Sequence, residues 1–255
     1  LFFTKEGYFK KITPISLRMG GEQKLKDGDV IQQSQESMNN TDLLFFSDKS
    51  QVYKTKARDF SDTKASVLGE FIPAKLNMDE GESAIYMLAT TDYSGYVFFF
   101  FENGKVAKVS LKAYETKTNR KKLTGAYSDK EKLSAIVFVN DEDSEILMRS
   151  SSGRALLLHT GAIASKTTRN TQGVAVFKQR KGHRLISAEL YHDGMLQTPQ
   201  RYRTKSIPSS GALPPAAGPQ RPSGESGCGT ASAPGSETTA ERRSAAAPTA
   251  GSAHS

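Results

Sequence analysis

Lysine and arginine are the residues whose number and placement most clearly suggest chemistry in this chain. The 255 residues include 35 Lys plus Arg and 27 Asp plus Glu, for a formal net charge of +8. Residues 1–100 hold 12 basic and 14 acidic side chains, residues 101–205 hold 20 and 10, and residues 206–255 are neutral. Such a basic half-domain is suited to a polyanionic partner. The alternative is an ordinary solvated surface.

Other chemistries have weaker support. Cys228 is the one cysteine, so no disulfide or cysteine-built metal site is possible within the chain. The four histidines are scattered, and the acidic residues at 141–145 are typical of a solvated turn. The longest apolar run, residues 96–101, is far shorter than the roughly 20 residues of a membrane span. We therefore expect no metal, no membrane contact and a cytoplasmic location.

One twelve-residue pattern recurs four times. An apolar run, a polar turn and a second apolar run occupy residues 1–12, 44–55, 98–109 and 147–158. The turn residues Gly7, Ser50, Gly104 and Gly153 lie 43, 54 and 49 residues apart. Phe, Val, Tyr and Ile favour strands, and Asn103–Gly104 is a strong turn signal. Each copy therefore predicts a β-hairpin, with the Phe98–Phe101 run as a core strand.

Two further features follow each hairpin. Polar turns lead into apolar runs near residues 26–31, 79–85, 128–137 and 180–186. Before these runs, a basic residue precedes a glycine: Arg18 and Gly20, Lys64 and Gly69, Arg120 and Gly125, Arg169 and Gly173. Units of about 40–50 residues with several short strands are typical of propeller blades. We predict an all-β, propeller-like fold with at least four blades.

The composition changes near residue 205. Of the last 50 residues, 39 are Ser, Pro, Gly, Ala or Thr, and none is aromatic. Such a segment cannot bury enough apolar surface to offset the entropy of ordering it. The sequence thus predicts a folded domain over residues 1–205 and a disordered tail over residues 206–255.

The repeated motifs resemble a known family. Leu1–Lys11, the basic residues before glycine, and Thr168–Val174 are similar to the C-terminal domain of bacterial type IIA topoisomerase A subunits, those of DNA gyrase and topoisomerase IV. The resemblance covers about residues 1–205 and implies a β-pinwheel, a propeller whose blades exchange strands. It also implies non-specific binding, wrapping and bending of duplex DNA in support of ATP-dependent control of DNA topology.

The resemblance implies DNA contacts at repeated basic positions. Three sets are expected to contact phosphates: Lys11, Lys54 and Lys108, four residues after the hairpin turn; Lys105 and Arg154, directly after it; and the loop residues Arg120, Lys121, Lys122, Lys166, Arg169, Arg180 and Lys181. Phosphate contacts position DNA without reading its sequence. For Lys11, Lys54 and Lys108, an alternative is that they extend along apolar neighbours at strand ends.

The resemblance also implies what lies outside this chain. Family members carry the catalytic tyrosine and metal on the cleavage core and bind ATP on the B subunit, so neither catalysis nor a cofactor is expected here; ATP and Mg²⁺ belong to the parent enzyme. Arg201–Tyr202 matches a family dipeptide, but it follows the last repeat. The expected partners are duplex DNA, the cleavage core and the B subunit, in the cytoplasm at the nucleoid.

Two departures from the family keep alternatives open. The gyrase heptad Gln-Arg-Arg-Gly-Gly-Lys-Gly is missing, and residues 179–182 match it only partly. A topoisomerase IV-type module that selects DNA segments is therefore one alternative, and a protein-binding propeller scaffold is another. Family pinwheels have five or six blades, so we expect further blades before Leu1.

Overall fold

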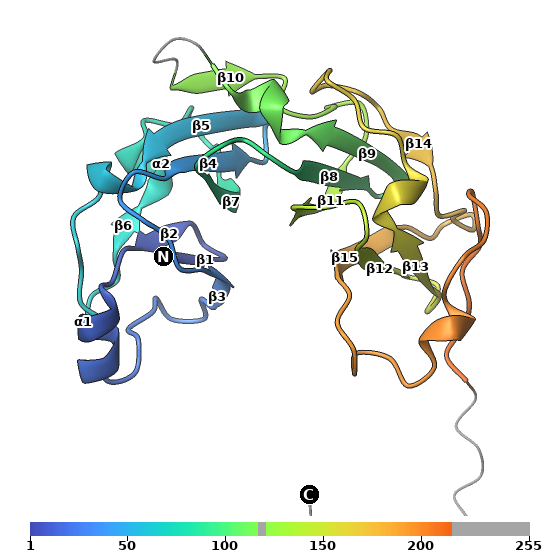
Figure 1. Ribbon diagram of the computed structural model, residues 1–255, viewed down its shortest axis with the longest axis horizontal. Helices are drawn as coiled ribbons and strands as arrows, with labels where there is room; N and C mark the ends of the chain where they lie inside the picture. Colours follow the sequence, from blue (N-terminus) through green and yellow to red (C-terminus); the bar gives the residue numbers. More distant parts are fainter. Residues whose placement is uncertain (117–120, 216–255) are drawn as a thin grey trace, which may run out of the picture. The chain divides into compact units, whose positions relative to one another are not determined.

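The computed structural model describes residues 1–116 and 121–215. Residues 1–215 form one compact unit. Within it, short antiparallel strands build four small sheets that follow one another in chain order (Figure 1). Each sheet corresponds to one sequence repeat and is called a blade, numbered 1 to 4. The predicted all-β, propeller-like fold with four blades is confirmed, and no described helix is long and apolar enough to cross a membrane.

The predicted hairpin forms the centre of each blade. The pairs are β1 (Phe2–Thr4) with β2 (Tyr8–Lys10), β4 (Asp42–Ser47) with β5 (Gln51–Lys56), β8 (Tyr96–Phe101) with β9 (Lys105–Ser110), and β12 (Glu145–Ser150) with β13 (Ala155–His159). All four repeated turn residues have positive φ. At Gly104 a Cβ would lie 2.0 Å from the carbonyl oxygen of Phe177, so this turn requires glycine.

The second recurring feature forms the innermost strand of each blade. These strands are β3 (Ile31–Ser34), β7 (Ala84–Thr90), β11 (Leu133–Val139) and β15 (Leu185–Leu190). Each pairs antiparallel with the first strand of its own hairpin. The entry to the strand is tied to the hairpin turn; for example, Glu102 N donates to Lys132 O at 2.8 Å.

The third recurring feature forms an outer strand on the preceding blade. β6 (Glu70–Phe71), β10 (Lys122–Thr124) and β14 (Val174–Ala175) pair with β2, β5 and β9. Each outer strand follows the hairpin of the next blade, so consecutive blades exchange strands, as the resemblance implied. Gly69 and Gly173 allow the close approach, because a Cβ there would lie 2.4 Å from Phe9 O and 2.3 Å from Val106 O, respectively.

The corresponding segment of the first repeat is helical instead. Residues Pro14–Met19 form α1, which begins at Thr13, whose side chain accepts a hydrogen bond from Ser16 N. No described blade precedes β1, so this segment has no described strand edge to pair with. The Thr-Pro start then favours a local helical turn. The remaining short helices are η1 (Ala57–Asp59), α2 (Ile72–Lys75), η2 (Leu111–Tyr114), η3 (Thr160–Ala162) and η4 (Pro199–Arg201).

The outer edge of blade 4 is covered by the chain that follows β15. Leu157 on β13 bridges to Arg203, and Ala155 bridges to Ala212. Ser209 bridges to Phe177, beyond the last outer strand of blade 3. Residues 206–215, expected to belong to the tail, are therefore part of the compact unit, because they satisfy backbone groups at this edge. The predicted tail from residue 216 onward lies outside the described residues.

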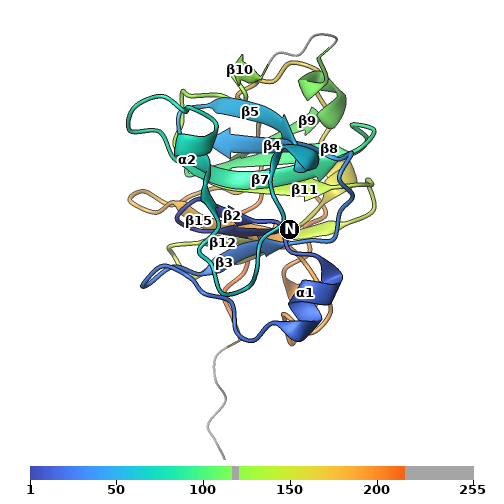
Figure 2. The same cartoon turned by 90° about the vertical axis from the view of Figure 1, so that its left-hand side faces the viewer.

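The core lies between consecutive blades. Phe3 of blade 1 and Phe45 of blade 2 belong to one buried cluster. On β8, Phe99 and Phe101 belong to a cluster shared with blade 2, whereas Phe98 and Phe100 belong to a cluster shared with blade 4. The alternating side chains of this strand thus serve both neighbouring blades. All four are fully buried, which confirms the prediction of a core strand. Figure 2 shows the stacked sheets from the side.

Candidate nucleic-acid interface

Three crossovers bring basic side chains together. A crossover is the point at which the chain leaves one hairpin and reaches the preceding blade. Thr63 N donates to Lys11 O at 2.7 Å, Lys54 N donates to Lys121 O at 2.7 Å, and Lys166 N donates to Lys108 O at 2.8 Å. Each crossover therefore joins one lysine predicted from the hairpin to the arriving outer segment. Two of the arriving residues are themselves predicted DNA contacts.

Lys108 is buried at its crossover. Its side chain is 1% exposed, and Nζ lies 2.6 Å from Glu142 Oε1 and 3.2 Å from Thr160 O. The ammonium also lies 4.3 Å from the centre of the Tyr96 ring, a cation–π distance. The hydrogen bond and charge of Lys108 lower the pKa of Glu142. This lysine is fully engaged within the protein.

Lys54 and Lys11 have corresponding environments. Lys54 Nζ donates to Tyr114 O at 3.0 Å and lies 4.9 Å from the Tyr93 ring centre, and desolvation lowers its pKa. Lys11 Nζ lies 3.1 Å from Asp62 Oδ1 and 3.0 Å from Asn39 Oδ1. We call Lys11, Lys54 and Lys108 the inter-blade lysines. Their placement favours the alternative expectation, in which they extend over neighbouring groups instead of contacting phosphate.

The outer sides of the same crossovers carry exposed lysines. Lys64, Lys121 and Lys166 are exposed, and within the described ranges none has an ion pair or a side-chain hydrogen bond. We call these three the rim lysines. Lys121 and Lys166 were expected as DNA contacts, whereas Lys64 was missing from that set. The signal that identifies it is the repeat itself, since Lys64 is the basic residue before Gly69.

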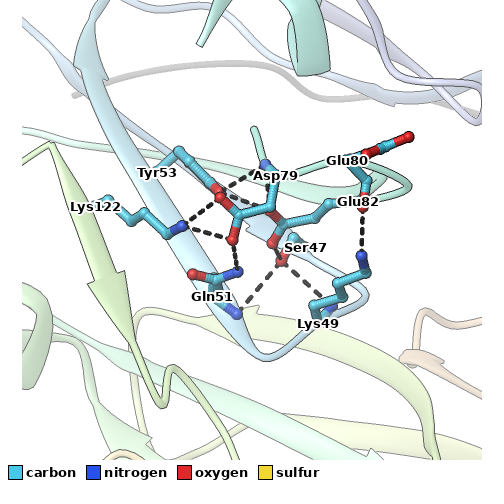
Figure 3. A network of polar contacts seen from close by, with 8 residues as sticks. All are labelled: Ser47, Lys49, Gln51, Tyr53, Asp79, Glu80, Glu82 and Lys122. Carbon is cyan, nitrogen blue, oxygen red and sulfur yellow. Dashed lines mark hydrogen bonds and ion pairs between the residues drawn. The ribbon is translucent and has the colours of Figure 1, made fainter. Parts of the chain in front are cut away.

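Lys122 lies on β10, but a carboxylate engages it. Its Nζ lies 2.7 Å from both Asp79 oxygens, and Asp79 also accepts from Gln51 Nε2 at 3.0 Å (Figure 3). Hydrogen bonds from Gln51 and Lys122 lower the pKa of Asp79. Beneath them, the buried Glu82 accepts from the Tyr53 hydroxyl at 2.6 Å. The network attaches β10 to blade 2 and leaves Lys122 little free charge.

The two predicted arginines make partial use of their donors. Arg169 Nη1 donates to Ala113 O at 3.1 Å, and its guanidinium lies 6.0 Å from the Tyr114 ring centre. Arg154 Nη1 donates to Gly211 O at 2.8 Å. Both side chains are half-buried. Because a guanidinium has five N–H donors, each retains donors for a phosphate.

The remaining predicted contacts lie around the turns of blades 3 and 4. Arg180 and Lys181 are exposed in the turn before β15, and Lys105 is half-buried at the start of β9. None of the three has a salt bridge among the described residues. Arg120 lies outside the described residues. The structure therefore groups Lys121, Lys166 and Arg169 at the crossovers and separates Arg180 and Lys181 from them.

The acidic turn and the Arg–Tyr dipeptide have structural partners. Glu142 pairs with Lys108, and both oxygens of Glu145 accept from Arg203 at 2.7 Å. No group of three metal-ligating side chains occurs among the described residues. Tyr202 is 5% exposed and packs in the apolar cluster of blade 4, which also contains Leu157. The site's chemistry is therefore electrostatic: it presents fixed, hydrated cations to an anion.

The comparisons with known proteins agree with this architecture. A family model described as "DNA gyrase C-terminal domain, beta-propeller" matches residues 41–66 and 144–191. The DNA gyrase A protein of Borrelia hermsii is 25% identical over 197 residues, which cover 74% of this chain and 24% of that protein. The corresponding DNA topoisomerase 4 protein of Bacillus subtilis is 27% identical over 158 residues, covering 60% and 20%. The chain spans about a quarter of such relatives.

Two solved structures share the fold. The C-terminal domain of a DNA topoisomerase IV superposes with a TM-score of 0.64 at 24% identity, covering 75% of this chain and 60% of that one. The ParC C-terminal domain of E. coli superposes with a TM-score of 0.62 at 14% identity, covering 85% and 93%.

The fold therefore defines a propeller-like domain of strand-exchanging blades. Together with the sequence relatives, it shows that the chain belongs to the family of C-terminal domains of type IIA topoisomerase A subunits.

Proposed function

We propose that this domain binds duplex DNA without sequence preference along the rim lysines and bends it, as part of a gyrase-like enzyme. The observation that carries the proposal is the recurrence of one exposed lysine at each crossover, without an acidic partner among the described residues. A wrapped duplex needs charge distributed along a surface instead of a pocket. Many phosphate contacts offset the several kcal/mol that bending costs.

The activity of the whole enzyme is part of the same proposal. The relatives matched are gyrase and topoisomerase 4 A subunits. We propose that the parent protein cleaves DNA with residues outside this chain and works with Mg²⁺ and an ATP-binding B subunit. In this arrangement the domain supplies DNA to the cleavage core and performs no bond chemistry itself.

The test is binding of the full chain to a random-sequence duplex across a salt series. The logarithm of affinity should fall linearly with that of salt concentration, with a slope of about −0.9 per neutralised phosphate. The double variant Lys121→Gln/Lys166→Gln should reduce this slope by about two. Lys5→Gln/Lys130→Gln is the matched control, because both lysines are exposed in turns away from the crossovers, and it should leave the slope nearly unchanged.

Two outcomes would contradict the proposal. Equal slopes for the two double variants would place the DNA elsewhere on the domain. No binding at low salt would remove the DNA function and favour a protein-binding scaffold, for which Ile15 and Met19 on α1 offer exposed apolar surface, 62% and 84% exposed.

A topoisomerase IV-type role is the second candidate, because relatives and solved structures of both types match. A domain that only selects segments binds DNA without trapping writhe. Relaxing circular DNA with a nicking–closing enzyme in the presence of the chain separates the two roles. A shift in linking number supports wrapping, and binding without a shift supports segment selection.

A further inference from the structure

The inter-blade lysines have partners that follow a rule. Each lysine extends from the second strand of one hairpin to two places that belong to the next blade. One is the turn that leads into that blade, represented by Asn39, the Tyr93 ring and Glu142. The other is the segment just after the next hairpin, represented by Asp62, Tyr114 O and Thr160 O. The same residue therefore connects three parts of the chain in each of three blades.

The backbone of each inter-blade lysine takes part as well. Lys108 O accepts from Lys166 N, and Ser110 N, two residues further along, donates to Lys166 O at 2.9 Å. Lys54 N donates to Lys121 O. The arriving outer segment is thus hydrogen-bonded to the very residue whose side chain fixes the next blade. Any change in the angle between two blades must move these contacts together.

The fourth repeat supplies an independent contrast. Leu157 occupies the position of the inter-blade lysines, and it is 1% exposed. It packs with Tyr202, and its N–H donates to Tyr202 O at 2.8 Å. No described blade follows blade 4. The position is lysine where a next blade offers carbonyl or carboxylate acceptors and leucine where the covering chain is apolar.

We propose that Lys54 and Lys108 are positioning residues that fix the angle between consecutive blades. In combination with the proposed function, this angle sets the spacing of Lys121 and Lys166 and hence the curvature of bound DNA. A direct phosphate contact would require Lys108 to leave Glu142 and Thr160 O. Removing one partner from a buried charge pair is strongly unfavourable, because the remaining charge stays desolvated.

The first test needs no DNA. In a Cys228→Ser background, nitroxide labels at Lys112→Cys in η2 of blade 3 and Ala162→Cys in η3 of blade 4 report the distance between the two blades by double electron–electron resonance. Lys108→Met should broaden or shift the distance distribution. Lys166→Met is the matched control, since it removes an equal charge from an exposed position at the same crossover, and it should leave the distribution unchanged.

A second variant guards against a folding failure. Glu142→Gln removes the ion pair but keeps Lys108, Thr160 O and the Tyr96 ring in place. It should cause a smaller change in the same direction. Distributions identical to that of the unsubstituted lysine protein in both Lys108→Met and Glu142→Gln would overturn the proposal.

The DNA-bound test separates this inference from the proposed function. A duplex of about 40 base pairs, well below the ~150-base-pair persistence length, carries fluorophores at its ends. Lys108→Met should lower end-to-end energy transfer while keeping the salt slope, and Lys166→Met should lower the slope by about one. An equal loss of slope in Lys108→Met would overturn the positioning role. If neither protein binds DNA but the blade distance still changes, the positioning role stands and the proposed function fails.

Discussion

At the scale of single residues, the environment of a lysine determines its role more than its place in a repeat does. Lys108 and Lys166 are joined by a backbone hydrogen bond of 2.8 Å. One is 1% exposed and paired, and the other is exposed with no partner among the described residues. A buried ammonium is stable only when paired and hydrogen-bonded. The exposed ammonium remains hydrated and can exchange counterions for phosphate.

The pairing of Lys108 with Glu142 predicts a pH dependence. The folded-state pKa of Glu142 lies below 4.5 because of the hydrogen bond and charge of Lys108. The stabilisation is therefore fully present above the unfolded pKa near 4.5 and is lost as the pH falls through the lower, folded pKa. Glu142→Gln should lower Tm at pH 7, and its difference from the unsubstituted protein should shrink toward pH 3.

Thermal melts over this pH range check the prediction. Glu131→Gln is the control, because Glu131 is an exposed carboxylate near β11 without an ion pair among the described residues. It should change Tm little at any pH. A Tm difference for Glu142→Gln that stays constant from pH 3 to pH 7 would contradict the electrostatic explanation.

At the scale of elements, the exchanged strands depend on close backbone approach. Gly173 has a φ of +73°, and a Cβ there would lie 2.3 Å from Val106 O. Gly182 has a similar φ of +78°, with no atom within 4 Å of its Cβ position. Gly182→Ala should therefore cost about 1 kcal/mol of unfolding free energy, the strain of a left-handed alanine. Gly173→Ala should cost about 1–3 kcal/mol more, because β14 must move away from β9.

Denaturant unfolding of the two alanine variants measures this difference. Amide hydrogen exchange locates it, because the extra loss of protection should be confined to β14 and the facing residues of β9. Equal free energies for the two variants would show that the approach of β14 to β9 is not a constraint.

The elements could be predicted from sequence as far as local signals determine them. The turn residues Gly7, Gly104 and Gly153 and the alternating apolar runs indicate the hairpins and inner strands. The helical turn at residues 14–19 and the burial of Lys108 could not be predicted, because each depends on whether a neighbouring blade offers an edge or an acceptor. Such contacts join residues of different repeats, and a single repeat does not show them. The same holds for Asp79, which engages Lys122.

At the scale of the whole molecule, the stability of the last blade depends on the chain that follows it. β13 exposes an edge that no outer strand from a described blade covers. Residues 203–212 cover it instead: Ala155 and Ala212 exchange backbone hydrogen bonds of 2.9 and 2.8 Å, and Leu157 N donates to Tyr202 O. An uncovered strand edge is a template for association between chains. The composition change at residue 205 is therefore not the structural boundary.

Two truncated proteins test this boundary. A protein ending at Pro215 keeps the contacts of Ser209 with Phe177 and of Ala212 with Ala155, so it should melt like the full chain and stay monodisperse. A protein ending at Lys205 loses both contacts and uncovers one end of β13. It should melt at a lower temperature and associate as its concentration rises. Light scattering and thermal melts at matched concentrations measure both effects. Identical behaviour of the two proteins would mean that residues 206–215 lie on the blade without stabilising it.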